Sequence, residues 1–190
     1  ATYPGDWYCE KFEGVLVEYK VVDTLDEVTN TMIPDSIPTL VTKSSGKPVQ
    51  IPRRWKEQMD AAFANGDLPL FWGVLHAGYG QQSKATKLKN GTLTSDADWN
   101  GVVIKVYSTT STDGADDSGF FQKPLSACQS FVERVETFHF HNYRVSEEQE
   151  RAILNLHRES RRKGGAGIVF RDTFTPTKLV TMDAPAYALY

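Results

Sequence analysis

The sequence predicts an α+β fold, a single compact domain with a mainly antiparallel sheet and two or three helices. Its length of 190 residues is the size of one domain. Alternating and β-branched runs typical of strands recur along the chain, and helical patterns occur between them without a regular βαβ rhythm. Because no repeat or long linker divides the sequence, we expect one domain over residues 1–190.

The first fifty residues predict turns and strands. Residues 1–10 form a polar and aromatic lead-in, with a turn at Pro4-Gly5. Residues 12–22 alternate and contain several β-branched side chains, so they predict a strand. Three prolines interrupt residues 29–50, where we expect extended segments and a short strand at Thr39–Thr42.

A helix is predicted from Pro52 to Asn65. Proline suits the first helical position, and Asn65-Gly66 is a good carboxy-terminal stop. The apolar residues recur at i, i+4, i+7 and i+8, which places them on one face. We therefore expect three large side chains of that face to pack into the core: Trp55, Met59 and Phe63.

The middle of the chain predicts two more strands and a second helix. Residues 68–75 are apolar and lead into a glycine-bearing loop over residues 76–82. Residues 99–107 contain a β-branched run that predicts another strand. Residues 108–119 are rich in Ser, Thr, Asp and Gly and predict an exposed loop, whereas the apolar spacing over residues 125–135 predicts a helix.

The clearest helix lies near the end of the chain. Ser146 is a suitable N-cap, and Gln149 three residues later completes a capping box. Gly164-Gly165 ends this helix. Further strands are expected at residues 137–145, 166–171 and 178–182.

Composition ranks the classes of function. The formal net charge of −3 argues against a nucleic-acid partner bound through bulk charge. No stretch approaches the ~20 apolar residues of a membrane span. The basic run Arg158–Lys163 could contact nucleic acid or an acidic partner, but the favoured explanation is an exposed helix end. With no specific catalytic motif, the leading hypothesis is a soluble domain that binds an unidentified small molecule or protein.

Three weaker observations bear on the compartment. Cys9 and Cys128 could form a disulfide or remain free thiols. Asn90-Gly91-Thr92 fits a glycosylation acceptor. The chain begins at Ala1, which fits a cleaved signal peptide or a removed initiator Met. Together they favour a secreted or extracellular protein, with a cytoplasmic one as the alternative.

The alternative hypothesis is an enzyme whose site contains His139 and His141. In the run Phe138-His139-Phe140-His141, a strand places both imidazoles on one face. Two imidazoles can bind a transition metal such as zinc if a third ligand joins them. The third ligand could be His76, His157, Glu136 or Asp172, and His76 is also a catalytic candidate. If the two residues bind no metal and take no part in catalysis, they are simply half-exposed strand histidines with polar partners. The run resembles the metal-binding strand of the alpha-class carbonic anhydrases over four residues.

The predicted first helix begins with an unusual set of cations. Arg53, Arg54 and Lys56 lie in its first turn, where positive charge opposes the helix dipole. Free backbone amides beside two arginines would suit a phosphate or carboxylate, so this helix start is a candidate anion-binding site. Otherwise these long side chains simply extend into solvent.

Two further family resemblances are short. Arg53 or Arg54, then Ser108-Thr109-Thr110 and Glu148-Gln149-Glu150, resemble the signature of the ADP-ribosyltransferases, which implies a remote alternative activity. Gly5-Asp6-Trp7 near the amino terminus, with Arg144 before the late helix, is similar to a lipocalin pattern and implies a β-barrel.

Overall fold

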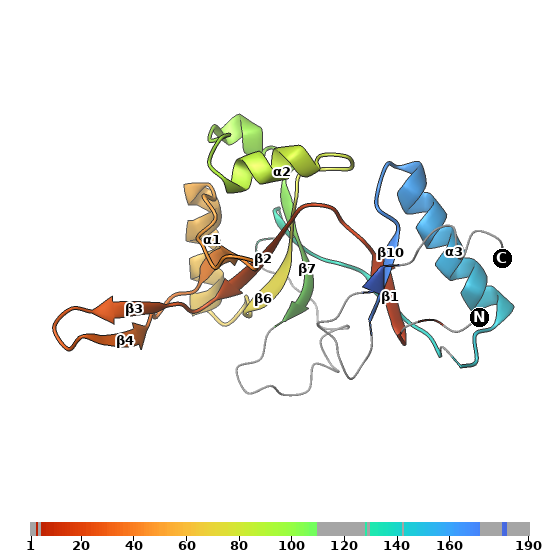
Figure 1. The fold of residues 1–190 in the computed structure, drawn as a ribbon, viewed down its shortest axis with the longest axis horizontal. Coiled ribbons are helices and arrows are strands. Elements are labelled where there is room, and N and C mark those ends of the chain that lie inside the picture. The colour runs from red at the N-terminus through yellow and green to blue at the C-terminus, as the bar shows by residue number, and fades with distance from the viewer. Residues whose placement is uncertain are drawn as a thin grey trace.

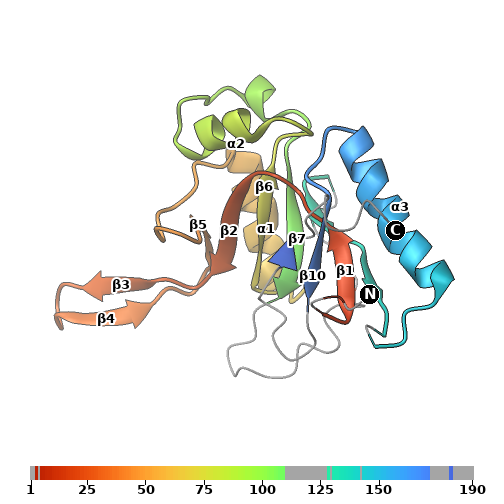
Figure 2. The same ribbon diagram turned by 45° about the vertical axis from the view of Figure 1, so that its right-hand side comes forward.

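The computed structural model describes residues 3, 5–109, 128, 130–141, 143–171 and 180–181. Within these residues three α-helices accompany three sheets whose strands are mostly antiparallel (Figure 1). The predicted α+β class is therefore confirmed. In both views the two larger sheets lie beside each other, and a third, two-stranded sheet projects from one end (Figure 2).

The first sheet has five strands in the order β5-β2-β6-β7-β8. Its neighbours pair antiparallel except for β7 and β8, which pair in parallel. A register shift between Trp72 and Gly73 marks a bulge in the pairing of β6 with β7. The strand bounds are β5 Thr39–Thr42, β2 Val15–Lys20, β6 Phe71–His76, β7 Val103–Thr109 and β8 Val132–Arg134.

Two helices, α1 (Arg53–Ala64) and α2 (Gln82–Lys89), cover one face of this sheet and build the largest core with it. Trp55 stacks on Phe131 with ring centroids 4.4 Å apart. As predicted, Trp55 and Met59 are buried, while Phe63 is half-buried against the same core. A short 3-10 helix, Asp96–Trp99, adds Trp99 to this cluster.

The second sheet has the strand order β11-β10-β1-β9, and all of its pairs are antiparallel. Its outer face is covered by α3 (Glu147–Arg162), where Ile153 and Leu154 pack on Tyr8, Phe140 and Phe170. The capping box of Ser146 and Gln149 forms as predicted. The strand bounds are β11 Val180–Thr181, β10 Ile168–Arg171, β1 Trp7–Glu10 and β9 Thr137–His139.

The inner faces of the two sheets meet in a third, smaller core. The first sheet contributes Trp72, Val74 and Tyr107, and the second contributes Cys9 and Val169. Arg171 is fully buried at this junction, where its guanidinium donates a hydrogen bond to the backbone oxygen of Tyr107. The guanidinium also lies 5.8 Å from the centre of the Trp72 ring.

The third sheet is the hairpin of β3 (Asp23–Asp26) and β4 (Thr31–Pro34), which connects β2 to β5. It extends away from both larger sheets (Figures 1 and 2).

Several local predictions were wrong. Residues 132–134 form β8 rather than a helix, because Val132 pairs beside Ile104 of β7 and is buried there. Residues 7–10 form the strand β1 instead of a lead-in, because β9 and β10 flank them on both sides. The helix α2 was not predicted, since only Ala85 and Leu88 of it are buried.

Other predictions are corrected or lie outside the described residues. Open sheets and the helix α1 exclude the lipocalin-like barrel. Only residues 137–139 of the expected strand 137–145 are in β9. The expected loop over residues 108–119 lies outside the described part from residue 110 onward.

Both cysteines, Cys9 and Cys128, are free thiols. Burial raises the pKa of the Cys9 thiol to about 12. The disulfide that would have favoured a secreted protein is therefore not formed. Among the described helices, none has the length and apolar character needed to cross a bilayer.

We predict that Met59→Ala destabilises the protein by ~2–5 kcal/mol, because it opens a cavity beneath α1 where the side chain is 1% exposed. The exposed neighbour Gln58 is a matched control, and Gln58→Ala should change the free energy of unfolding by less than ~0.5 kcal/mol. Urea titration measures both. Equal effects of the two substitutions would contradict the assigned buried face.

Candidate functional cleft between the two sheets

Residues 11–14 carry the chain from β1 of the second sheet to β2 of the first, and they form one wall of a cleft. The backbone nitrogen of Lys11 donates to the oxygen of Gly167 at 2.9 Å. At Gly14 the chain passes so close to β6 that a Cβ atom would lie 2.0 Å from the backbone oxygen of Leu75. Only glycine fits this position.

Tyr107 of β7 fixes the crossing segment, residues 11–14, through two hydrogen bonds. Its hydroxyl accepts a hydrogen bond from the Phe12 backbone nitrogen at 2.8 Å and donates one to the backbone oxygen of Glu10 at 3.1 Å. Burial raises the pKa of Tyr107, so the phenol stays neutral. A single hydroxyl of the first sheet thus satisfies two backbone groups of the segment that leaves the second sheet.

His76, a predicted catalytic residue, lies at the end of β6 beside the same segment. It is 6% exposed, and its Nδ1 donates to the backbone oxygen of Glu13 at 2.8 Å. Its ring packs edge-on against Phe12 and Tyr79. These contacts fix the crossing segment in place, whereas a catalytic role for His76 stays a prediction.

Tyr79 joins the loop after β6 to the second sheet. Its hydroxyl donates to Oε2 of Glu10 at 2.7 Å. Burial, followed by this hydrogen bond, raises the pKa of Tyr79 to about 12. The ring also packs closely against Gly165, where an added Cβ would lie 3.0 Å from Tyr79 Cε1. The loop before α2 is therefore joined to the segment that follows α3.

The cleft has a volume of about 520 Å³, within the usual range for a small-molecule site. Among the described residues that line it, Lys11 is the one cation and Glu13 the one carboxylate. The amide of Gln82 donates to the backbone oxygen of Gly14 at 3.1 Å, which fixes the start of α2 at the cleft. The remaining lining residues supply mostly apolar surface: Phe12, Gly14, Leu16, Val74, Tyr107 and Val169.

Two further lysines stack on aromatic rings of this region. The ammonium of Lys105 lies 4.5 Å from the centre of the Phe12 ring and forms an ion pair with Glu133. The ammonium of Lys43 lies 4.3 Å from the centre of the Trp72 ring. Two cation–aromatic contacts therefore lie near the junction of the two sheets.

His139 and His141 are exposed and lie on one face, as alternation predicts, with ring centroids 5.2 Å apart. Phe140 points the other way into the core beneath α3. Trp7 packs against the His139 ring. No group of three metal-ligating side chains occurs among the described residues, so the proposed zinc site gains no support. Asp172, one possible third ligand, lies outside the described part.

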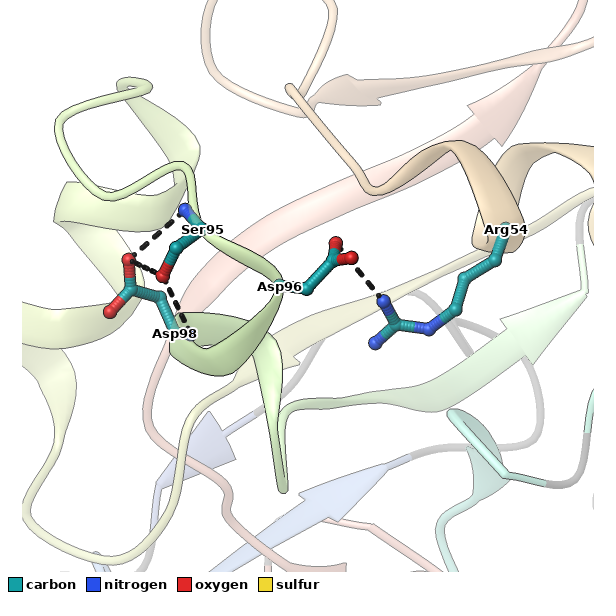
Figure 3. A network of polar contacts seen from close by, with 4 residues as sticks. All are labelled: Arg54, Ser95, Asp96 and Asp98. Carbon is teal, nitrogen blue, oxygen red and sulfur yellow. Dashed lines mark hydrogen bonds and ion pairs between the residues drawn. The ribbon is translucent and has the colours of Figure 1, made fainter.

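Arg53 and Arg54 are both paired with carboxylates. Nε of Arg53 lies 2.9 Å from Glu57, one turn along α1. The Arg54 guanidinium lies 3.3 Å from Oδ1 of Asp96, in the short helix that Ser95 and Asp98 cap (Figure 3). These carboxylates offset the unfavourable charge at the helix start. Anion binding there stays a prediction, on the face of the first sheet opposite the cleft.

The ADP-ribosyltransferase resemblance is not supported by the arrangement of its three motifs. Glu148 and Glu150 belong to α3, where the first turn is acidic and complements the helix dipole. That helix packs on the second sheet, whereas Arg54 lies on α1 behind the first sheet. Ser108 is fully buried within β7.

Comparison with known proteins bears on the fold. No family model matches the chain, and no curated protein matches it. A solved structure of a Lig E DNA ligase, described as DNA binding with a minimal scaffold, is similar with a TM-score of 0.59 and 15% sequence identity. The match covers 90% of this chain and 56% of that ligase chain, so the chain spans about half its length. At this identity the likeness shows a shared fold.

This likeness overturns the leading functional expectation. The chain was expected to bind an unidentified small molecule or protein, with nucleic acid argued against. The fold is instead shared with a ligase whose structure is described as DNA binding. Net charge is a poor guide to a local surface because it averages over the whole chain. Several acidic residues lie in the projecting hairpin and in the first turn of α3, although Glu13 lines the cleft.

The cleft itself was missed because residues 12–14 were assigned to the strand that in the structure begins at Val15. One signal could have found it. Lys11 and Glu13 precede a glycine at the boundary between two runs of strand residues, which is where chain crossings and ligand contacts often lie.

We predict that Tyr107→Phe destabilises the protein by ~1–3 kcal/mol, because the Phe12 nitrogen and Glu10 oxygen lose their shared hydroxyl at a buried position. Tyr143 is 73% exposed, so Tyr143→Phe is the control and should have little effect. Chemical denaturation gives both values. A loss below ~0.5 kcal/mol for Tyr107→Phe would show that the bridge is dispensable.

Proposed function

We propose that this protein binds DNA, with the cleft between the two sheets and its basic border as the contact surface. The observation that carries the proposal is the similarity of its fold to a Lig E DNA ligase over 90% of the chain. The cleft adds support, since it combines a lysine with aromatic and apolar walls. Phosphates attract cations, and bases stack on aromatic surfaces.

A basic border lies at one end of this cleft. The helix α2 begins at Gln82, which lines the cleft, and carries Lys84, Lys87 and Lys89. The carboxy-terminal end of α3 lies at the same end of the molecule, as the Tyr79 contact with Gly165 requires (Figure 1). That end exposes Arg158, Arg161, Arg162 and Lys163. Glu159 neutralises Arg162 in part, so the border keeps a local excess of positive charge.

We predict that duplex DNA binds with an affinity that falls steeply as salt rises. In Lys84→Ala with Lys87→Ala, the slope of log K against log[salt] should become shallower by about 1.8, at ~0.9 for each phosphate that a lysine no longer neutralises. Fluorescence anisotropy over a salt series measures this change.

Arg53→Ala with Arg54→Ala is the matched control, because it also removes two cations but on the face opposite the cleft. This variant should bind DNA with a nearly unchanged slope. Equal loss in both double variants would show that bulk charge, and not the border of the cleft, binds the DNA. The absence of binding by the unaltered protein at low salt would reject the proposal itself.

A second candidate activity follows from Lys11. Joining DNA ends requires a terminal phosphate to be activated, and a lysine amine can carry the activating group. The Nζ atom would attack the α-phosphorus of a nucleoside triphosphate, forming a P–N bond as the bond to pyrophosphate breaks. Pyrophosphate then leaves. The ammonium loses one proton to solvent before the attack, and the nitrogen loses a second as the P–N bond forms. The cleft volume suits a nucleotide, and Lys11 is the one cation among its described lining residues.

We predict that incubation with an α-³²P-labelled nucleoside triphosphate and Mg²⁺ labels the protein through an acid-labile bond. Each of the four nucleotides is tested separately. The label should be absent in Lys11→Ala and retained in Lys105→Ala, which removes a neighbouring cation that does not line the cleft. Failure to label with any nucleotide would reject this chemistry and leave DNA binding to be judged by its own experiment.

A further inference from the structure

The hairpin of β3 and β4 carries most of the large apolar side chains that the structure leaves exposed. Among the described residues seven such side chains are exposed, and five of them belong to the hairpin and the segment that follows it. The other two, Leu16 and Tyr143, lie apart from the hairpin. The five are Leu25, Val28, Met32, Ile33 and Ile37, with Val28 at the turn 94% exposed.

The apolar side chains are arranged on the hairpin in a defined way. Leu25 pairs directly with Met32, and Asp23 pairs with Pro34. Side chains of directly paired residues and of residues two apart share a face of the ribbon. Leu25, Met32 and Pro34 therefore share one face of the ribbon with Asp23, and no other described strand pairs with the hairpin.

Local hydrogen bonds stabilise the hairpin of β3 and β4, with which no other described strand pairs. The Val28 nitrogen donates to Oδ1 of Asp26 at 3.0 Å, and Asn30 adopts a left-handed conformation with φ of 54°. At the base, the Thr24 hydroxyl donates to Oδ1 of Asp35 at 2.5 Å. An isolated two-stranded ribbon is marginally stable in water, so these bonds preorganise a surface that the rest of the fold does not use.

Charge restricts what this surface can contact. Residues 21–38 contain four carboxylates, Asp23, Asp26, Glu27 and Asp35, and no lysine or arginine. Such a segment repels nucleic-acid phosphates and anionic lipid headgroups. It attracts a surface that combines apolar residues with cations.

We propose that the hairpin is a docking arm for a second protein, whose surface offers an apolar groove bordered by lysine and arginine. The apolar face of Leu25 and Met32 enters the groove, and the carboxylates contact its border. The hairpin leaves β2 at Lys20, whereas the cleft meets the same strand at its other end, near Gly14. Both surfaces can therefore be occupied together. The docking role does not depend on the proposed DNA binding.

The test uses a display library of random 16-residue peptides selected against the whole protein. Enriched peptides should combine large apolar residues with lysine or arginine. Their affinity should fall at least tenfold for Leu25→Ser with Met32→Ser. Tyr143→Ser is the matched control for exposed apolar surface and should bind them normally. No enrichment, or enriched peptides that bind both variants equally, would overturn the proposal.

Two further measurements separate the competing occupants. Asp26→Asn with Glu27→Gln should weaken binding of the enriched peptides, whereas Glu147→Gln with Glu148→Gln, which neutralises two exposed carboxylates of α3, should not. Equal weakening of peptide binding by both double variants would show that net charge alone accounts for the binding, and would overturn the proposal. Sedimentation velocity should show a monomer. A dimer that Leu25→Ser with Met32→Ser abolishes would assign the hairpin to a second copy of this chain and overturn the proposal.

Folding and DNA affinity complete the test. Circular dichroism and the melting temperature should be unchanged in the hairpin variants, since the altered side chains are exposed. DNA affinity should also be unchanged in them, and a loss confined to these variants would place the hairpin in the DNA interface and overturn the docking role. If the unaltered protein binds no DNA, the DNA proposal fails while the peptide result still decides the hairpin.

Discussion

The hydroxyl of Tyr107 is the contact on which the arrangement of the two larger sheets depends. It lies in the first sheet and satisfies backbone groups on both sides of Lys11, where the chain leaves the second sheet. His76 and Gln82 hold the rest of the segment by its carbonyl oxygens. Because the wall of the cleft is backbone fixed at several points, its shape is set before any ligand arrives. Preorganisation of this kind lowers the cost of binding.

Local patterns in the sequence predicted those elements whose stability is largely local. The capping box at Ser146, the apolar stripe through Trp55 and Met59, and the strand Thr39–Thr42 all form as expected. Prediction failed where pairing partners lie far away in the sequence. Thus β1 is a strand because β9 and β10 flank it, and β8 because β7 accepts it in parallel.

The candidate site was harder to predict than the fold, for a related reason. Its lining combines residues 11–16 with Val74, Gln82, Tyr107 and Val169, and no single stretch of sequence brings these together. The histidine and arginine candidates were conspicuous as motifs, but the structure gives His76 a backbone contact and pairs Arg54 with Asp96. Unusual local sequence thus identified residues with structural partners, whereas the cleft came from long-range packing.

The position of β1 also orders events during synthesis of the chain. Four strands of the first sheet, β5-β2-β6-β7, lie within residues 15–109 and can pair early. In contrast, Trp7–Glu10 must wait for Thr137–His139 and Ile168–Arg171, because both of its neighbours follow the first sheet in the sequence. Long-range closure of this kind is slow and leaves strand edges exposed. A nascent chain would therefore hold a nearly complete first sheet while its amino-terminal strand remains unpaired, which is the stage at which a chaperone would be needed most.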